Sequence, residues 1–579
     1  MRTWRWVSVL AMLMFVLAAC GPQAGASPSA EESEEPEASE PAPSESEGTA
    51  YEGMSYPEDG PAECGAAETD THAEYTSNIE QIRAEDEHTV VFDLCNPDVA
   101  FLSKIAFTSF AINDADYLEA NAPDGTIVEA PNGTGPYVLD AWNRGTDITL
   151  AANPDYWGDA PLSSTVIFRW SAEAAQRLVE LQSGTVDGID NPGPDDFPTI
   201  EGDANLQLLP REGLNTFYVG FNNVFPPWDD EEVRQAIAQG LDRQAIVDAY
   251  YPPGSEVASH FTPGAIPFGE AGEPWYDYDQ EAARAVLEPL AITTTIQYRD
   301  VVRGYLPLPA QVAVEIQAQL AEIGVTATPE PIESTAFLDA ANAGELDGIH
   351  LLGWGADYPD ATNFLDFHFG AGASVQFGDK FDDITEPLAV GASSVEDADR
   401  EAAYTEANDA IRTHVPMIPI AHGGSGTAWQ ADNEGAHSSP LGNESMAAIG
   451  PGADDQLVWM QNAEPGGLYC ADETDGESLR VCEQVMEALY AYEVGGTAAI
   501  PALAEECVPN EALDEWTCTL RQGVTFHDGA ALDANDVVVT YAALWDAEHP
   551  LHVGRTGTFD YFSALWGGFL NAPLPEPAP

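Results

Sequence analysis

Residues 293–352 alternate between strand and helix patterns, and this alternation constrains the possible fold more than any other feature of the sequence. The β-rich stretch TTTIQYRD begins at Thr293, and the helix pattern QVAVEIQAQLAEI that follows it ends at Gly324. The strand VTATPEPI, a second helix (TAFLDAANAG) and a third strand (DGIHLLGW) complete the run. Strands that alternate with helices form sheets covered by helices. The pattern therefore predicts an α/β lobe with a mostly parallel sheet.

The rest of the chain carries similar signals without a short internal repeat. Alternating, β-branched and aromatic residues predict strands, and four-residue apolar spacing predicts helices. The strands are expected at 89–94, 147–152, 165–170 and 215–223, and the helices at 172–182 and 231–249.

The first 50 residues have the composition of an export signal followed by a tether. Arg2 and Arg5 precede an apolar run, and the stretch LAACG ends it at Cys20. This pattern is typical of a bacterial lipoprotein signal with Cys20 as the lipid attachment point. The alternative is a transmembrane helix, but such a helix needs about 20 apolar residues and this run is shorter. Residues 21–50 contain no aromatic and no basic residue, so we expect a disordered acidic tether with a span of roughly 30 Å.

The chain is strongly acidic, with 98 Asp and Glu residues against 19 Lys and Arg residues and a formal charge of -79. Only Lys104 and Lys380 are lysines. Contacts to phosphates need clustered basic residues, so this charge argues against nucleic-acid binding and against a basic membrane patch. We interpret the acidity as a solubilising surface, which would also suit a salty habitat.

Six cysteines remain when Cys20 is set aside, and an even number in an exported protein favours disulfides. Six cysteines permit 15 pairings. We expect the local ones, Cys507 with Cys518 across a hairpin, Cys470 with Cys482, and Cys64 with Cys95. Metal ligation is a weaker alternative, because none of these cysteines has C-x-x-C spacing.

Two blocks of the sequence carry a resemblance to a known family. They are PNGTGPYVLDAWNRGTDITLAANPDYWG at 131–158 and EWTCTLRQGVTFHDGAALDANDVVVTY at 515–541. Both resemble the extracellular solute-binding proteins of peptide and nickel ABC importers (family 5). In that family the FHDG block comes first, so the chain resembles a circular permutant. A fusion with part of a second receptor is the rival explanation, although no motif is duplicated.

Further segments resemble the family in order, namely VRQAIAQGLDRQAIV (233–247), LLGWGADYPDATNFLDFHF (351–369), HVPMIPIAH (414–422) and SPLGN (439–443). The resemblance implies a two-lobed periplasmic-binding-protein-like α/β fold with an extra subdomain. The expected divisions are a signal peptide (1–20), the tether (21–50), lobe I (51–225 and 425–571), lobe II (226–424) and a tail (572–579). Residues 51–74 match no part of the family pattern, and the family's Gly-rich loop after the helix at 280–290 is missing.

The resemblance also implies where a ligand binds. In peptide-binding members the acid at the position of Asp357 pairs with the ligand's α-ammonium; the alternative is a turn in which Asp357 caps backbone amides. Trp354, Tyr358 and Asp360 belong to the same cleft loop. Arg303 could meet a carboxylate with Tyr298 and Tyr305 beside it, or these could be surface and core residues. Asn222 and Asn223 line the hinge or form a turn.

Catalytic patterns are weak in this sequence. His527-Asp528-Gly529 suits a turn ahead of a helix at 534–545, and HGGSG at 422–426 lacks the last glycine of a nucleophile elbow, because Thr427 stands there. His549 and His552 lie in a Pro-containing loop.

We therefore expect a lipid-anchored, extracytoplasmic and monomeric receptor, without catalytic residues, metal or cofactor, that captures a short peptide or similar solute for an ABC permease. An oligosaccharide or metal-chelate ligand, or an exported hydrolase, are the alternatives.

Overall fold

The computed structural model describes residues 51–299, 303–451 and 455–574. The predicted signal peptide, Cys20 and the predicted tether lie outside these residues, as does most of the predicted tail. No helix within the described residues has the length and apolarity needed to cross a membrane. Residues 51–574 belong to one compact unit, which contains two lobes.

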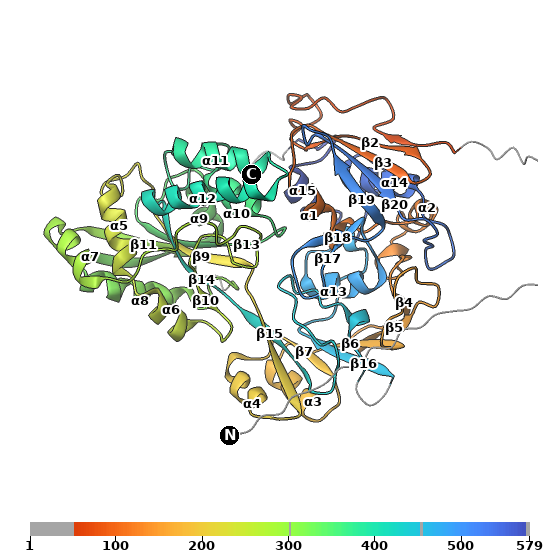
Figure 1. Cartoon of the computed structure of the whole chain (residues 1–579), viewed down its shortest axis with the longest axis horizontal. Coiled ribbons are helices and arrows are strands. Elements are labelled where there is room, and N and C mark those ends of the chain that lie inside the picture. Colours follow the sequence, from red (N-terminus) through yellow and green to blue (C-terminus); the bar gives the residue numbers. More distant parts are fainter. Residues whose placement is uncertain (1–50, 300–302, 452–454, 575–579) are drawn as a thin grey trace, which may run out of the picture. The chain divides into compact units, whose positions relative to one another are not determined.

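Lobe II, which we define as residues 215–422, is built on a six-stranded sheet with the order β10-β14-β9-β13-β11-β12 (Figure 1). Its strands are β9 (Asn215–Gly220), β10 (Glu256–Val257), β11 (Thr293–Arg299), β12 (Thr326–Ile332), β13 (Ile349–Gly355) and β14 (Met417–His422). The predicted strand-helix alternation at 293–352 is present, with parallel pairing of β11 to β12 and to β13. The expectation of a mostly parallel sheet is wrong, because β9 runs antiparallel to both β13 and β14.

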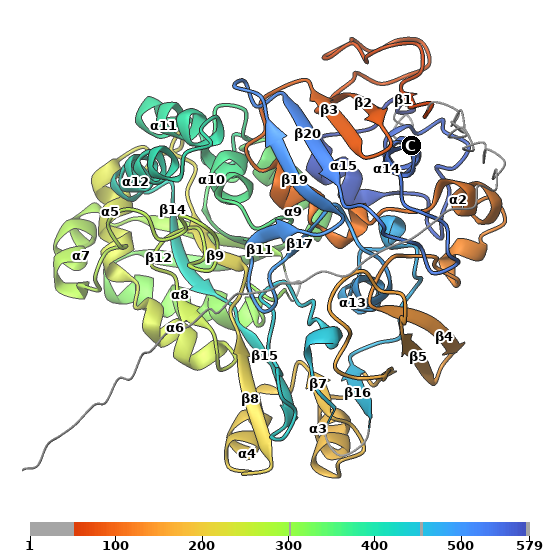
Figure 2. The same ribbon diagram turned by 45° about the vertical axis from the view of Figure 1, so that its right-hand side comes forward.

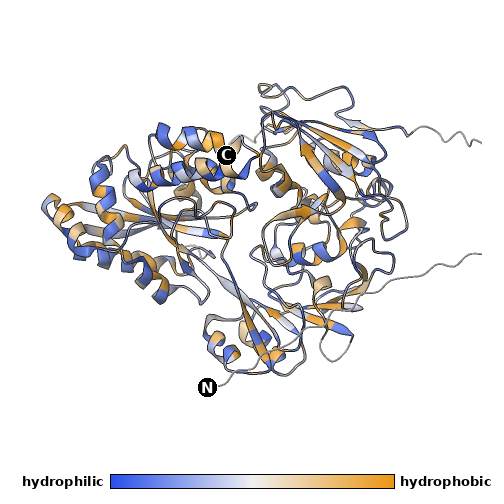
Figure 3. Cartoon of the chain, viewed as in Figure 1, coloured by the Kyte–Doolittle hydropathy of each residue, from blue (hydrophilic) through white to orange (hydrophobic). Residues whose placement is uncertain are grey.

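Amphipathic helices cover this sheet, and α11 and α12 show alternating hydrophilic and hydrophobic bands (Figure 3). The predicted helix at 231–249 is two helices, because the Asp242 side chain accepts a hydrogen bond from Ala245 N and starts a new helix there. The helices are α5 (Glu231–Gly240), α6 (Arg243–Tyr250), α7 (Gln280–Leu287), α8 (Pro309–Glu322), α9 (Ser334–Asn342), α10 (Ala361–Phe369), α11 (Asp382–Ala392) and α12 (Asp397–His414).

Lobe I comprises the other described residues and contains a five-stranded sheet, β1-β2-β3-β20-β19, and a seven-stranded sheet, β4-β5-β6-β16-β7-β15-β8. The first sheet consists of β1 (Ser55–Tyr56), β2 (Ile79–Asp86), β3 (Thr89–Leu94), β19 (Ala504–Pro509) and β20 (Glu515–Leu520). The second consists of β4 (Tyr137–Asn143), β5 (Asp147–Ala152), β6 (Thr165–Trp170), β7 (Gly188–Asp190), β8 (Leu206–Arg211), β15 (Ser425–Gln430) and β16 (Gln456–Gln461), and β17 (Tyr490–Tyr492) pairs separately with β18 (Ala499–Pro501).

Both sheets of lobe I join segments that are far apart in the sequence. The red-orange strands β2 and β3 lie beside the blue strands β19 and β20 in Figure 1, and β3 pairs antiparallel with β20. In the other sheet β6 pairs parallel with β16. The helices of this lobe are α1 (Phe101–Ile105), α2 (Ala115–Asn121), α3 (Ala174–Gln182), α4 (Phe197–Glu201), α13 (Gly476–Val485), α14 (Ala534–Trp545) and α15 (Asp560–Trp566).

The core of lobe I draws on both ends of the described chain. Phe92 and Phe101 contact Tyr541, Trp516 and Trp566, and all five rings are buried. The helix α14 is buried along almost its whole length, and a capping box between Asp533 and Asp536 fixes its start. Large aromatic side chains supply most of the burial in such a core, so residues 75–127 and 469–566 pack as one body.

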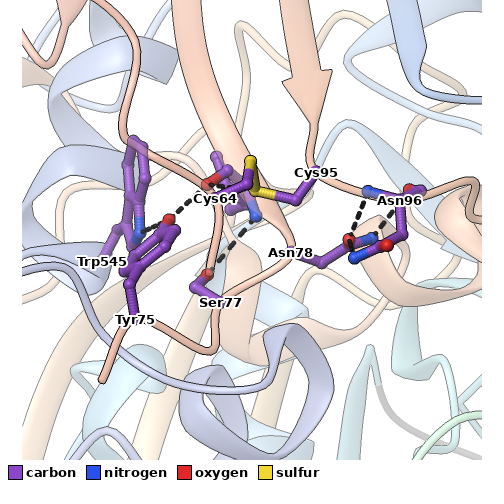
Figure 4. Close-up of a disulfide and its surroundings, with 8 residues drawn as sticks. Cys64, Tyr75, Ser77, Asn78, Cys95, Asn96 and Trp545 are labelled. Atoms are coloured by element: carbon purple, nitrogen blue, oxygen red, sulfur yellow. Dashed lines mark hydrogen bonds between the residues drawn. A yellow bond between two sulfur atoms is a disulfide. The ribbon is translucent and has the colours of Figure 1, made fainter. Parts of the chain in front are cut away.

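The three disulfides are Cys64–Cys95, Cys470–Cys482 and Cys507–Cys518, which are the pairs expected from the sequence. Cys507 stands directly opposite Cys518 in the β19–β20 hairpin. The Cys64–Cys95 bridge lies close to Tyr75, whose hydroxyl accepts a hydrogen bond from Trp545 Nε1 (Figure 4). This bridge attaches residues 51–74, which the sequence left unplaced, to the five-stranded sheet.

Two connections link the lobes, one between β8 and β9 and one between β14 and β15. Figure 2 shows β8 and β15 side by side next to α4, and they pair antiparallel in lobe I. The predicted lobe boundary at residue 225 is wrong, because β9 belongs to the lobe II sheet; the chain crosses between Arg211 and Asn215.

Candidate functional site

A cavity of about 650 Å³ lies between the two lobes at these connections. Small-molecule sites commonly have volumes of about 300–1,000 Å³. Lobe II lines it with Asp357, Arg303 and Tyr305, whereas lobe I contributes Phe107, Arg211, Glu212, Leu441, Thr474 and Tyr561. The walls therefore combine acidic, basic and aromatic groups, which suits a ligand with both charged and apolar parts.

Asp357 follows the end of β13, and Asn363 on α10 holds it in place. The Asn363 side-chain amide donates a hydrogen bond to Asp357 Oδ2 (3.1 Å). The Asn363 side-chain oxygen accepts hydrogen bonds from Asp357 N (2.9 Å) and from Trp354 Nε1 (3.2 Å). One amide on a helix thus fixes the backbone and the carboxylate of this loop.

Burial raises the pKa of the Asp357 carboxyl group, and the hydrogen bond from Asn363 offsets only part of that effect. Within the described residues Asp357 forms no salt bridge. A desolvated carboxylate gains most from a cationic partner that also donates hydrogen bonds. The site at Asp357 is therefore suited to an ammonium group.

Arg303 and Tyr305, which belong to the loop after β11, line another part of the cavity wall. Arg303 is exposed and lies in a tight turn, where it forms a β-bridge with Leu306. The Tyr305 ring is buried, its hydroxyl accepts a hydrogen bond from Arg299 Nη2 (2.7 Å), and its carbonyl oxygen accepts one from Tyr251 (2.6 Å). Tyr305 also occupies the space beside Gly353 on β13, where a larger side chain would overlap its ring.

A buried ion network underlies the lobe I side of the cavity. Arg211 Nη2 lies 2.5 Å from Glu444 and 3.0 Å from Asp190, and Arg480 contacts the same two carboxylates at 3.0 and 3.2 Å. Burial alone would raise the pKa of Glu444, but the two arginines lower it to about 2. The charges of the two guanidinium groups and the two carboxylates cancel, so this network forms a neutral, hydrogen-bonded support beneath the cavity.

Glycines pack closely where the chain crosses between the lobes. A side chain at Gly213 or Gly423 would overlap backbone atoms of Gly423 and Gly304 respectively, and one at Gly424 would overlap Gly254. The Asn215 side chain bridges the two connections, since it donates to Gly423 O (2.8 Å) and accepts from Gly423 N (2.9 Å). The HGGSG motif is therefore the β14–β15 connection between the lobes.

Several predicted ligand residues lie outside this cavity. Asp360 caps α10 and forms an ion pair with Arg400 (2.9 Å), Asn222 bonds to Gly344 O, and Asn223 bonds to Asp379. Their polar groups are used by the fold and none of the three lines this cavity; Asn222 follows the turn alternative, since its side-chain oxygen accepts a hydrogen bond from Val224 N. Tyr298 is buried in the lobe II core, Trp354 stacks on Phe367 behind Asp357, and Tyr358 contacts lobe I.

Four important residues escaped the sequence analysis, namely Asn363, Arg211, Leu441 and Tyr561. Asn363 follows Asp357 by six residues, so a search for an amide on the helix after the acidic loop could have found it. The other three come from lobe I segments whose proximity to Asp357 depends on tertiary packing. Of the weak catalytic patterns, His527 lies 3.1 Å from Gly135 O, and His549 and His552 have pKa values lowered by burial.

The comparisons with known proteins agree with this architecture. The family model described as bacterial extracellular solute-binding proteins, family 5 (middle), matches residues 48–376 and 498–559. The di/tripeptide-binding protein 3 of Pseudomonas aeruginosa (strain UCBPP-PA14) is 31% identical over 372 residues, which cover 62% of this chain and 69% of the relative.

Two Haemophilus proteins are also similar. Heme-binding protein A of Haemophilus influenzae is 29% identical over 385 residues, covering 64% of this chain and 70% of that protein. The solved structure of HbpA2 from Haemophilus parasuis has a TM-score of 0.61 and 28% identity, covering 64% of this chain and 75% of that one. On this evidence, the chain belongs to the bacterial extracellular solute-binding proteins of family 5.

Proposed function

We propose that this protein is the receptor of an ABC importer and captures a short peptide with a free amino terminus in the cavity between its lobes. The observation that carries the proposal is Asp357, a desolvated carboxylate that lines the cavity and is oriented by Asn363. The peptide's ammonium would complete the hydrogen bonding of this group. The di/tripeptide-binding relative supports this ligand class.

The charged wall residues support a ligand with an ammonium at one end and a carboxylate at the other. Asp357 in the loop after β13 and Arg303 in the turn after β11 both line the cavity, so a carboxylate and a guanidinium are available to the two ends of one ligand. An extended peptide of two or three residues spans about 7–10 Å, with its carboxylate toward Arg303.

A metal chelate is the second candidate ligand, because a relative of similar identity is a heme-binding protein. Among the described residues that line the cavity there is no histidine or cysteine. The oxygen ligands that remain are carboxylates and tyrosines such as Asp357 and Tyr561, and we favour the peptide because its ammonium matches the desolvated Asp357 carboxylate.

Isothermal titration calorimetry distinguishes these candidates. We expect heat from free di- and tripeptides such as Ala-Phe and Ala-Ala-Phe, and weak or no heat from N-acetyl-Ala-Phe, oligosaccharides and haemin. Mass spectrometry of the same mixtures should recover the peptide intact, because the receptor does not cleave it. Binding of haemin without binding of any peptide would contradict the proposal.

We further propose that the receptor acts as a monomer outside the cytoplasm, anchored by a lipid on Cys20 and standing off the membrane on residues 21–50. The lipobox, the acidic tether and the three disulfides support this placement. Metabolic labelling with a fatty acid should mark the parent protein and leave Cys20→Ser unlabelled. Labelling of both would contradict this assignment.

Finally, we propose that the order of the chain is a circular permutation of the family's order. The motif order supports it, and so do the contacts of residues 72–78 with residues 566–573. Ala73 N donates to Ala572 O (2.9 Å) and Asn78 N donates to Trp566 O (2.6 Å). Segments that meet in this way can be joined without moving the fold.

The test is to restore the family's order. A chain opened between Pro451 and Asp455, with Leu574 joined to Tyr51 by a Gly/Ser linker of about ten residues that can span the length of α14, should unfold cooperatively and bind Ala-Phe as the parent does. A rearranged chain that forms lobe II but leaves lobe I unfolded would contradict the proposal.

A further inference from the structure

Tyr358 extends from lobe II into lobe I. It follows Asp357 in the loop between β13 and α10, yet its ring packs against the hydrophobic cluster of lobe I. Burial is the main cause that raises the pKa of the Tyr358 hydroxyl, and Asp98 of lobe I is the next. The residue next to the ammonium site is thus buried by the opposite lobe.

Lysine 104 on α1 meets this ring from the lobe I side. The Lys104 ammonium lies 5.2 Å from the centre of the Tyr358 ring and 5.4 Å from that of Trp566. It also forms a salt bridge of 2.6 Å with Asp98, and the two side chains are only 11% and 7% exposed. An ammonium within about 6 Å of an aromatic face is attracted to it, most strongly when it is desolvated.

The two halves of this contact are each fixed within their own lobe. In lobe I, Asp98 holds Lys104 and also accepts a hydrogen bond from Ala100 N at the start of α1. In lobe II, the Tyr358 hydroxyl lies 3.2 Å from Thr362 Oγ1, which donates to Asp360 Oδ1 (2.7 Å). Arg400 then anchors Asp360 through two contacts of 2.9 Å. Asp360 and Thr362 therefore serve the positioning of Tyr358.

We propose that Lys104 and Tyr358 form a latch between the lobes, and that Lys104 is a positioning residue that holds the Asp357 loop in its ligand-binding arrangement. The latch is separate from the ligand cavity, whose lining includes neither residue. Its contribution is the same for every ligand, because it stabilises the arrangement of the two lobes rather than a contact with a particular ligand group. The consequence for affinity rests on the proposed peptide-receptor function.

The only other lysine provides a matched control. Lys380 donates hydrogen bonds to Ser374 O (2.7 Å) and His368 O (3.4 Å), so it is also tied down, but within lobe II alone. Lys104→Met and Lys380→Met therefore remove the same charge from a bridging and a non-bridging position. Tyr358→Leu removes the ring, whereas Tyr358→Phe keeps it and loses only the contact with Thr362.

Hydrogen exchange on the ligand-free full chain tests the latch without any peptide. In Tyr358→Leu, which leaves the Lys104–Asp98 pair of lobe I intact, amides of residues 98–107 in lobe I should exchange faster than in the parent. Lys104→Met should in turn speed the exchange of residues 356–360 in lobe II. Lys380→Met should leave both regions close to the parent rates, and Tyr358→Phe, which keeps the ring but loses the contact with Thr362, should change them less than Tyr358→Leu does. If Tyr358→Leu leaves lobe I exchange unchanged, the latch does not exist.

Calorimetry then measures its effect on binding. Lys104→Met and Tyr358→Leu should each weaken binding of Ala-Phe and of Ala-Ala-Phe by a similar factor, on the order of 10-fold. Weakening of one peptide only would overturn the positioning role, because it would indicate direct contact with that ligand. If the parent binds no peptide, the proposed ligand class fails, and the exchange rates alone decide the latch.

Discussion

Replacing Asp357 with asparagine removes the charge that we assign to the ligand's ammonium and changes little else. The backbone amide of residue 357 still donates to Asn363 Oδ1, and this bond (2.9 Å) does not involve the substituted side chain. The loop should therefore keep its conformation, and the free energy of unfolding should change by less than about 1 kcal/mol.

The expected loss of affinity follows from the surroundings of the carboxylate. It is buried enough to have a raised pKa, and one hydrogen bond from Asn363 is its described side-chain contact. Breaking a buried charge pair by removing one partner costs about 3–5 kcal/mol. The lower value is used because the loop is half-buried, and about 3 kcal/mol corresponds to roughly 150-fold weaker binding of Ala-Phe.

Calorimetry with Ala-Phe and N-acetyl-Ala-Phe measures this loss. The acetylated peptide should bind weakly to the parent and lose little more in Asp357→Asn, since the pair is already broken. Glu212→Gln is the matched control, because Glu212 lines the same cavity but is exposed, and screened charges contribute little. Equal affinity of parent and Asp357→Asn for Ala-Phe would refute the assignment.

Three further predictions concern pH, hinge packing and a disulfide. Binding requires the ionised form of Asp357, so affinity for Ala-Phe should be complete above the pKa of its carboxyl group and fall about tenfold per pH unit below it. Burial raises that pKa, so calorimetry should detect the fall at a higher pH than for an exposed aspartate. Asp357→Asn should show no such fall. Gly423→Ala should lower the free energy of unfolding in urea by about 1–3 kcal/mol, because the added methyl group overlaps Gly304 O. Gly355→Ala, at a position with open space around it, should change the free energy of unfolding by less than about 1 kcal/mol. Equal effects of the two substitutions would contradict the packing described. Replacing Cys64 and Cys95 with serine should lower the free energy of unfolding by about 3–4 kcal/mol, since their bridge closes a segment with a separation of 31 residues. An unchanged urea midpoint would show that this bridge adds no stability.

Most of the elements that the local sequence signals predicted are present in the structure. The strands at 89–94, 147–152 and 165–170 have the predicted bounds, because alternate side chains of a strand point to the same face of the sheet and the apolar ones are buried there. The helix predicted at 231–249 failed at Asp242, where a capping side chain outcompetes continuation of the helix. Strand direction was also misjudged, since β9 and β14 join the lobe II sheet from chain segments outside the alternating run.

The site could be predicted only where it depends on local sequence. Asp357 lies in the Gly/Pro-rich turn that follows a buried strand, and the family resemblance, which the local sequence motif carries, implied its place at a ligand site. Asn222, Asn223 and Asp360 have the same local character, but their partners Gly344, Asp379 and Arg400 lie at least 40 residues away and use up their polar groups. Arg211 and Tyr561 reach the cavity through packing between distant segments, which no local pattern encodes.

A crystal structure of the protein with Ala-Phe bound tests the central claim most directly. The account predicts a peptide in the cavity of about 650 Å³, with its ammonium within hydrogen-bond distance of the Asp357 carboxylate and its carboxylate toward Arg303. A peptide bound elsewhere, or bound there with its ammonium away from Asp357, would contradict it.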